Sequence, residues 1–196
     1  MSKQKKIGLY FGSFNPIHIG HLIIANHLVE HTNLDEVWFM VTPHNPHKEK
    51  KTLLADIHRL ELVSRAIEDY PKLKASNLEF DLPQPSYTVN TLAHIAEKYP
   101  KYTFSLIMGE DNLKSFPKWK NYETILKYHN IYVYPRISQL QVPGFLVKHP
   151  KIHYVDAPII ELSATAIRKA IKVNKNIKPL VPLAVWDYMD EMNFYR

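Results

Sequence analysis

The sequence contains no cysteine. Disulfide bonds, thiolate nucleophiles and thiolate-bound metal sites are therefore excluded, because each of them needs a cysteine sulfur. The absence of cysteine also fits a protein of a reducing intracellular compartment. Any catalysis by this chain must therefore use other side chains.

Long apolar segments are also absent. The apolar runs reach only the length of a strand, as in EVWFMV at 36–41, whereas a membrane-spanning helix needs roughly 20 residues. The basic start, MSKQKK, is followed by neither an adequate hydrophobic region nor a small-residue cleavage site, so no signal peptide is expected. We expect a cytoplasmic protein with no membrane partner.

Basic blocks of the kind that bind nucleic acids are missing too. The 196 residues include 25 Lys and Arg against 19 Asp and Glu, a formal net charge of +6. This balance favours anionic ligands, or it reflects a well-solvated surface rich in lysine. Because the basic residues are spread along the chain without interleaved aromatic residues, we expect no nucleic acid partner. A polyphosphate bound in one pocket would account for the charge equally well.

Strand-like and helix-like segments alternate along the chain. Strands are predicted at 6–11, 37–42, within 73–80, and at 102–108, 131–134 and 152–156. Helices are predicted at 20–30, 53–68, 88–98, 112–128 with an interruption near Pro117, 163–173 and 183–193. This alternation is typical of βαβ units. It predicts an α/β fold: a Rossmann-like, doubly wound, mainly parallel sheet with helices on both faces. Residues 1–196 would form one domain, with a helical part at about 163–196 packed on it.

The loop after the first predicted strand has the context of a phosphate-binding turn. The segment GSFNPIHIGH at 12–21 follows a strand and opens a helix, although it contains neither a P-loop nor a dinucleotide fingerprint. Gly12 permits a tight turn. His18 and His21 share one face of the helix start, and Gly20 between them leaves room for an anion. Two imidazoles beside the positive end of a helix can stabilise added negative charge on a phosphate. No metal site is expected, because no third ligand stands at a suitable spacing.

A second helix start, IIELSATAIR at 159–168, follows the last predicted strand. Ser163 is a favourable N-cap. Since Ala166 cannot complete a capping box, the N–H groups of the first turn, around Thr165, are expected to meet a phosphate. Arg168, about one turn further along, can bind the β- or γ-phosphate oxygens of a nucleotide. An ordinary capped helix with a surface arginine is the alternative.

The first loop resembles the His-x-Gly-His signature of the nucleotidylyltransferase superfamily. The second segment is similar to the Ile-Ser-Ser-Thr-x-Ile-Arg motif of the same superfamily, with Leu162 and Ala164 as departures. From Lys6 to the final helix, the chain resembles the bacterial nicotinate-nucleotide adenylyltransferases. The resemblance implies an enzyme that transfers the AMP part of ATP to nicotinate mononucleotide, giving deamido-NAD and pyrophosphate in NAD biosynthesis.

The resemblance also implies roles for individual residues. Catalysis falls to His18, His21 and Arg168. ATP and its phosphates would contact Gly12, Ser13, Phe14, Lys48, Gly109, Asp111, Ser163 and Thr165, and the nicotinate nucleotide would contact Thr88, Trp119 and Lys120. Thr88 could instead serve only as a helix cap, and Trp119 could serve only in core packing. Glu110 departs from the family pattern Gly-Ala-Asp, and Asn15 stands where the family often has Asp.

The implied reaction is a direct displacement at the α-phosphorus, in which positioning and charge neutralisation carry the rate. Mg²⁺ is expected to arrive on the ATP phosphates, mostly ligated by water, with no protein-built metal site. Nicotinamide mononucleotide and phosphopantetheine are the alternative acceptors. A non-catalytic nucleotide-binding or RNA-binding module is the alternative from another class. The sequence leaves the oligomeric state open, a homo-oligomer included.

Overall fold

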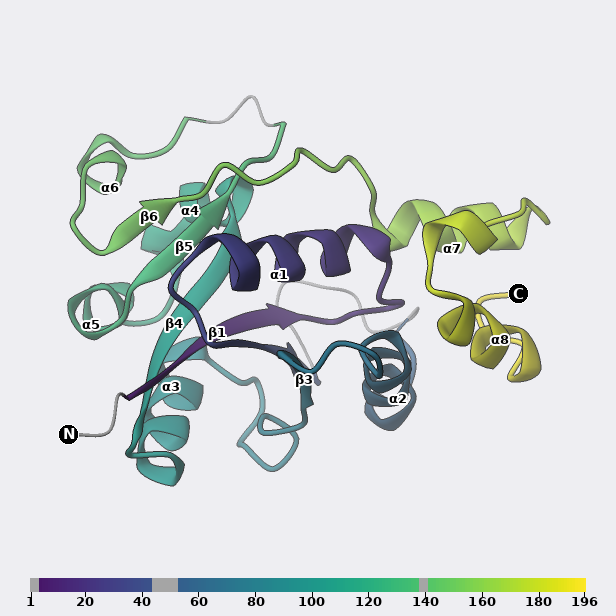
Figure 1. Cartoon of the computed structure of the whole chain (residues 1–196), viewed down its shortest axis with the longest axis horizontal. Coiled ribbons are helices and arrows are strands. Elements are labelled where there is room, and N and C mark those ends of the chain that lie inside the picture. The colour runs from purple at the N-terminus through teal and green to yellow at the C-terminus, as the bar shows by residue number, and fades with distance from the viewer. Residues whose placement is uncertain (1–3, 44–52, 138–140) are drawn as a thin grey trace.

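Six parallel strands form one sheet at the centre of the structure, a computed structural model that describes residues 4–43, 53–137 and 141–196 (Figure 1). In chain order they are β1 (Lys5–Gly12), β2 (Glu36–Val41), β3 (Leu73–Ser76), β4 (Tyr102–Gly109), β5 (Ile131–Tyr134) and β6 (Ile152–Tyr154). Across the sheet the order is β3-β2-β1-β4-β5-β6, and every neighbouring pair is parallel. The order reverses between β1 and β4, as in the Rossmann fold, so the predicted fold class is confirmed.

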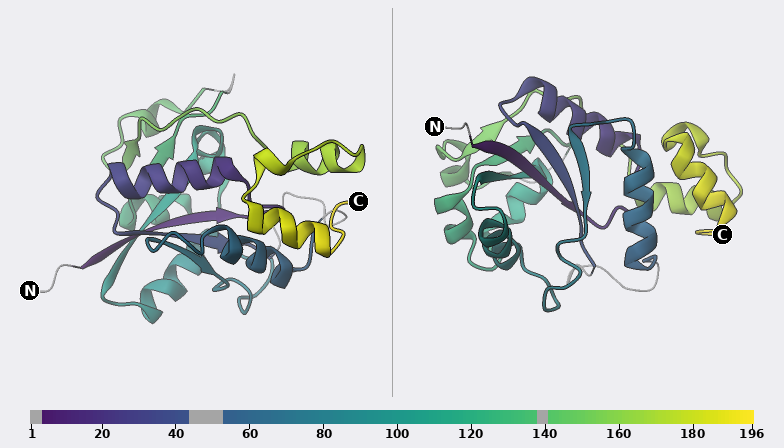
Figure 2. Two further views of the ribbon diagram at one scale, coloured as in Figure 1. Left: turned by 45° about the vertical axis from the view of Figure 1, so that its right-hand side comes forward. Right: turned by 60° about the horizontal axis from the view of Figure 1, so that its bottom comes forward.

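Helices cover both faces of this sheet (Figure 2). One apolar core includes α1 (Ile19–His31), α2 (Asp56–Ala66), α7 (Ala164–Lys172) and α8 (Leu183–Glu191). The other includes α3 (Thr88–Lys98), α4 (Glu110–Ser115), α5 (Tyr122–Tyr128) and α6 (Gly144–Val147). Because side chains alternate along a strand, Leu9 packs in the second core and its neighbour Tyr10 in the first. All six residues of β2 are buried, as expected for a parallel strand covered on both faces.

The two last helices lie beyond the carboxyl end of β1, beside α2 (Figures 1 and 2). The inward-facing Ile167 and Ile171 of α7, with Val185 and Met189 of α8, belong to the same core as α1 and α2. Helix α8 also contacts α2 directly. This packing brings the last residues of the sequence to the edge of the sheet formed by the carboxyl ends of its strands.

The start of α2 differs from its prediction. The periodicity predicts a helix from residue 53, but the helix begins at Asp56. The peptide groups of Leu54 are already used elsewhere: its N–H donates to Oδ1 of Asn15 (3.2 Å), and its carbonyl accepts from Nε of Arg59 (3.0 Å). Tertiary hydrogen bonds therefore hold this segment outside the helix.

Short elements account for the other differences. The helix predicted at 112–128 is divided into α4, a 3₁₀ turn at Phe116–Lys118 and α5, because Pro117 lacks the N–H that a continuous helix needs. Helix α6 and a 3₁₀ turn at Lys178–Leu180 are too short to show a periodic pattern, and the sequence did not predict them.

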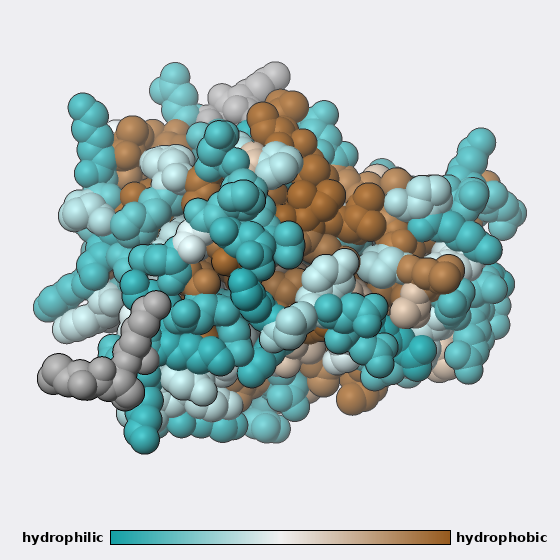
Figure 3. Space-filling model, viewed as in Figure 1, coloured by the Kyte–Doolittle hydropathy of each residue, from teal (hydrophilic) through white to brown (hydrophobic). Residues whose placement is uncertain are grey.

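Apolar side chains gather on the surface over α1 and the segment between β6 and α7 (Figure 3). The exposed apolar residues include Ile23 of α1 and Ile159 in that segment. Within the described ranges, no helix is long and apolar enough to cross a bilayer.

Candidate active site

A cavity of about 550 Å³ opens at the carboxyl ends of β1, β4 and β5, where the strand order reverses. A volume of this size is within the range of small-molecule sites, and the position is where such sheets bind ligands. Nine of the predicted site residues line it: Gly12, Ser13, Phe14, His18, His21, Asp111, Ser163, Thr165 and Arg168. Both predicted helix starts therefore border the same cavity, although they lie at opposite ends of the sequence.

The loop after β1 forms one wall of the cavity. The backbone of Phe14 has a positive φ of 44°, and the aromatic ring is almost fully buried. It packs edge-to-face on Phe39 (5.3 Å between centroids) and on His21 (5.1 Å). A Cβ at Gly12 would lie 2.8 Å from this ring, so only glycine fits there. The packing thus holds a backbone conformation that is uncommon for a residue other than glycine.

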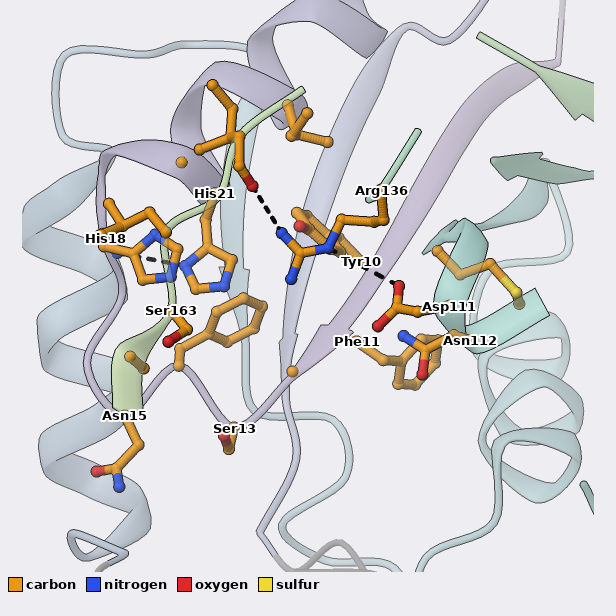
Figure 4. A pocket seen from close by; sticks show the side chains of 18 of the residues that line it. Tyr10, Phe11, Ser13, Asn15, His18, His21, Asp111, Asn112, Arg136 and Ser163 are labelled. Atoms are coloured by element: carbon orange, nitrogen blue, oxygen red, sulfur yellow. Dashed lines mark hydrogen bonds and ion pairs between the residues drawn. The ribbon is translucent and has the colours of Figure 1, made fainter. Parts of the chain in front are cut away.

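The two histidines of the motif lie side by side at the start of α1 (Figure 4). Their rings are stacked with 3.7 Å between centroids. The backbone N–H of His18 donates to Nδ1 of His21 (3.3 Å), so a neutral His21 carries its proton on Nε2. Burial, together with the positive charge of Arg136, lowers the pKa of His18 from 6.5 to about 4. His18 is therefore neutral at pH 7 and interacts with a ligand as a neutral hydrogen-bonding group.

His18 is also a buried polar group whose hydrogen-bonding capacity is incompletely used. Its side chain is largely inaccessible, and its Nδ1 has no hydrogen-bond partner among the described residues. A Cβ at Gly20 would lie 3.1 Å from that nitrogen and 2.9 Å from Cγ2 of Ile160. Gly20 therefore allows the segment before α7 to approach α1 closely beside the histidine pair.

The second helix start reaches the loop after β1 through Arg168. As predicted, Ser163 is the N-cap of α7, and its Oγ accepts from the N–H of Ala166 (3.2 Å). Nη1 of Arg168 donates to the backbone carbonyl of Asn15 (2.7 Å), and Nη2 is 3.3 Å from Oγ1 of Thr165. The guanidinium is thus fixed at the edge of the cavity while part of it remains accessible.

Arg136 is a lining residue that the sequence did not reveal. It follows β5, in a loop without a recognisable motif, and Figure 4 shows it between His21 and Asp111. Nη1 donates to the carbonyl of Ile160 (2.8 Å), and Nε is 3.9 Å from Oδ1 of Asp111. Because β5 lies beside β4, next to the reversal of strand order, its position marks the loop after it as a candidate for ligand binding.

Gly109 leaves space for two side chains of the cavity lining. A Cβ there would lie 2.4 Å from Oδ1 of Asp111 and 3.0 Å from Cγ of Arg136, so glycine is needed for both side chains to take these positions. Gly109 itself does not line the cavity. Asp111, at the start of α4, does.

The residues predicted to hold the nicotinate nucleotide lie outside the lining of this cavity. Lys120 contacts the neighbour of Thr88 in sequence: its Nζ is 4.3 Å from the ring centroid of Tyr87. Trp119 is half-buried and packs on Phe116 (5.5 Å between centroids), so it contributes to packing while part of it stays accessible. Lys120 therefore lies near the start of α3, where Thr88 is, and all three residues lie outside the cavity lining. Lys48 lies outside the described residues.

The alternative role of Thr88, as the cap of α3, is contradicted by the structure. Tyr87 is the N-cap residue, Thr88 is already the first residue of the helix, and no side chain caps this end. The helix is instead fixed from its second turn, where Oγ1 of Thr91 donates to the buried Glu79 (2.5 Å). Burial raises the pKa of Glu79, while hydrogen bonds from Thr91 and Thr42 oppose this shift.

The chemistry of the cavity is that of an anion site. Arginines 136 and 168 and two imidazoles face one carboxylate, Asp111. No group of three or more His, Asp or Glu side chains suited to a metal ion occurs in residues 4–43, 53–137 and 141–196. A negatively charged ligand therefore matches the lining.

Comparison with known proteins identifies the family. The model of the cytidylyltransferase-like family matches residues 9–170, and together with the relatives below this places the chain among the nucleotidyltransferases. A probable nicotinate-nucleotide adenylyltransferase of Flavobacterium psychrophilum is 63% identical, covering 97% of this chain and 99% of the relative. That of Bacteroides fragilis is 48% identical, covering 93% and 90%. The chain belongs to the nicotinate-nucleotide adenylyltransferase family, and the predicted resemblance and enzyme class are confirmed.

A solved structure shares the same fold. Plasmodium falciparum nicotinic acid mononucleotide adenylyltransferase, complexed with NaAD, superposes with a TM-score of 0.82 at 22% identity, covering 97% of both chains. At this identity the likeness concerns the fold alone.

Proposed function

We propose that the chain transfers the AMP part of ATP to nicotinate mononucleotide, giving deamido-NAD and pyrophosphate, a step of NAD biosynthesis. One observation carries the proposal: the starts of α1 and α7, with His18, His21, Ser163 and Arg168, line one cavity at the reversal of strand order. The relative from F. psychrophilum, 63% identical over nearly the whole chain, supports the choice of acceptor. Because the reaction consumes ATP, we also propose a cytoplasmic location.

The proposed reaction needs no covalent intermediate. A 5′-phosphate oxygen of nicotinate mononucleotide attacks the α-phosphorus of ATP, the bond to the bridging oxygen of the β-phosphate breaks, and pyrophosphate leaves with its electrons. His21 lines the cavity with its Nδ1 occupied by the N–H of His18, so its Nε2–H would be the donor to the α-phosphate. His18 lies stacked against it and is neutral at pH 7. Charge that develops on the α-phosphate is stabilised by this pair and by the N-terminus of α1.

The leaving group is placed at the second helix start. Arg168 is fixed by Asn15 and Thr165, and its remaining N–H groups can bind the β- and γ-phosphates. Ser163 and Thr165 border the same position. Lys48 is retained as a proposed phosphate contact. Arg136, held between Ile160 and Asp111, adds a second guanidinium for the triphosphate.

Mg²⁺ fits this proposal as an ion carried by the nucleotide. Among the described residues the cavity lining holds one carboxylate, Asp111, and that group already lies near Arg136, so most ligands of the ion would be phosphate oxygens and water. Bound there, Mg²⁺ supplies charge neutralisation to the phosphates.

Nicotinate mononucleotide is assigned to the group formed by Thr88, Trp119 and Lys120. Trp119 offers an aromatic face, and Lys120 offers a positive charge for the ring carboxylate. A site built around a carboxylate rejects the corresponding amide strongly, because a charged hydrogen-bonding group would be left without its partner.

Product analysis of the purified chain tests the proposal. ATP and Mg²⁺ are incubated with nicotinate mononucleotide, nicotinamide mononucleotide, phosphopantetheine or no acceptor, and pyrophosphate and the dinucleotide products are measured. We expect deamido-NAD as the main product. Preferred use of either other acceptor would replace the proposed substrate, and no pyrophosphate with any acceptor would support a non-catalytic nucleotide-binding protein.

A further inference from the structure

Asn15 joins three distant parts of the chain to the loop after β1. It is 3% exposed. Its side-chain Oδ1 accepts from the N–H of Leu54 (3.2 Å), just before α2, and from the hydroxyl of Tyr195 (2.7 Å), 180 residues further along the sequence. Its backbone carbonyl accepts from Nη1 of Arg168 (2.7 Å), on α7. The position of this one residue therefore sets where Arg168 lies relative to the loop.

Tyr195 is directed to Asn15 by the way α8 ends. After α8, Asn193 has a φ of 54° and Tyr195 a φ of 68°, two left-handed residues that reverse the chain direction. The N–H of Phe194 donates to the carbonyl of Met189 (3.0 Å), which fixes this reversal onto the helix. Burial raises the pKa of the Tyr195 hydroxyl, so the group stays protonated and remains a donor at physiological pH.

The same loop is held from the α2 side by Arg59. This fully buried guanidinium donates to the carbonyl of Ser13 (2.7 Å) and to that of Thr42 (2.9 Å), at the ends of β1 and β2, while Asp56 balances its charge. Arg59 fixes Ser13 without touching Asn15 in these contacts. Tyr195 instead bonds to Asn15, the residue of the loop whose carbonyl accepts from Arg168.

We propose that Tyr195 is a positioning residue for ATP: its hydroxyl fixes the Asn15 side chain, and thereby the carbonyl that orients Arg168 toward the phosphates. The inference rests on the proposed function, in which Arg168 binds the leaving pyrophosphate. Tyr195 does not line the cavity and acts through Asn15. Its loss should weaken the ATP side of the site and spare the group around Thr88, Trp119 and Lys120.

The test is Tyr195→Phe, with Tyr188→Phe as the matched control. Both changes keep the ring and remove one hydroxyl from the same part of the chain. The hydroxyl of Tyr188 bonds to Nδ1 of His58 (2.9 Å), on α2, and has no contact with the loop after β1 among the described hydrogen bonds. Removing one such hydrogen bond changes an equilibrium about 3- to 10-fold.

We expect Tyr195→Phe to raise KM for ATP about 3- to 10-fold, to lower kcat/KM by a similar factor, and to leave KM for nicotinate mononucleotide within about 2-fold. The dissociation constant of ATP, from calorimetry without acceptor, should rise to the same extent. Tyr188→Phe should leave all of these constants near wild type. Melting temperature and circular dichroism establish that both variants are folded at the assay temperature.

A double-mutant cycle checks the route through Arg168. In an Arg168→Ala background, Tyr195→Phe should have little further effect on kcat/KM, since the group that it positions is gone. An undiminished additional loss there, or equal ATP constants for the two phenylalanine variants, would overturn the inference while leaving the proposed function intact. If wild type forms no deamido-NAD, the proposed function fails, and ATP calorimetry still decides the role of Tyr195.

Discussion

The rings of His18 and His21 stack with 3.7 Å between centroids and 20° between planes, and the backbone N–H of His18 donates to Nδ1 of His21. Stacking on the neutral, buried ring of His18 fixes the orientation of the His21 ring, and with it the direction of its Nε2. A donor held in place before the ligand arrives needs no rearrangement during the reaction, which is the condition for effective stabilisation of developing charge.

Replacement of His21 should therefore affect the chemical step more than binding. For His21→Ala we expect kcat to fall by about 10²–10³-fold, the loss typical of one missing transition-state donor, with a much smaller change in KM for either substrate. Pyrophosphate release under saturating substrates gives kcat, and an unchanged melting temperature shows that the fold is intact. A variant with wild-type kcat would remove His21 from the proposed mechanism.

The low pKa of His18 links stability to pH. Burial and Arg136 lower this pKa from 6.5 to about 4, so the folded state favours the neutral imidazole. The associated stability is fully present above pH 6.5. It is lost as pH falls through 6.5 toward 4, because His18 of the unfolded chain is then protonated while His18 of the folded chain stays neutral. This lowers the free energy of unfolding by on the order of 3 kcal/mol.

Urea unfolding of wild type and of His18→Gln at pH 7.5, 6, 5 and 4 measures this effect. We expect the free energy of unfolding of wild type to fall more steeply toward pH 4 than that of the variant, since only wild type has this imidazole. Parallel curves for the two proteins would mean that the pKa of His18 is close to its ordinary value.

Arg136 should prove a strong determinant of nucleotide affinity. It lies in the cavity between Ile160 and Asp111, and its Nε is 3.9 Å from Oδ1 of Asp111. Charge-assisted hydrogen bonds are worth about 1.5–3 kcal/mol, so Arg136→Gln should lower kcat/KM for ATP by about 10–100-fold. The same change should raise the pKa of His18, which NMR titration of the imidazole can follow. An unchanged kcat/KM would show that this guanidinium does not contact the nucleotide.

The sequence could predict the parts of the site that are local. The loop at 12–21 and the segment at 159–168 carry their chemistry within ten residues each, and the rule for parallel sheets brings both to the same edge. The contacts of Arg136 could not be predicted in this way, because its loop has no motif. The bond between Asn15 and Tyr195 joins residues 180 positions apart, and only the packing of α8 on α2 brings them together. Element boundaries failed for the same reason at Leu54, where tertiary hydrogen bonds outweigh helix periodicity.

Gly20 offers a final test of the close approach between α1 and the segment before α7. Alanine favours a helix over glycine by about 1 kcal/mol. At this position, however, its Cβ would lie 2.9 Å from Ile160 and 3.1 Å from the ring of His18. Overpacking typically costs 1–3 kcal/mol, so this cost should outweigh the gain in helix propensity. The substitution should then displace His18 and lower kcat/KM about 10-fold or more. Gly144→Ala is the matched control, since a Cβ there meets nothing within 4 Å and the residue is also at a helix start. Steady-state kinetics and thermal melting should give a lower kcat/KM and a lower melting temperature for Gly20→Ala than for Gly144→Ala. Equal activities would show that α1 and residue 160 separate easily.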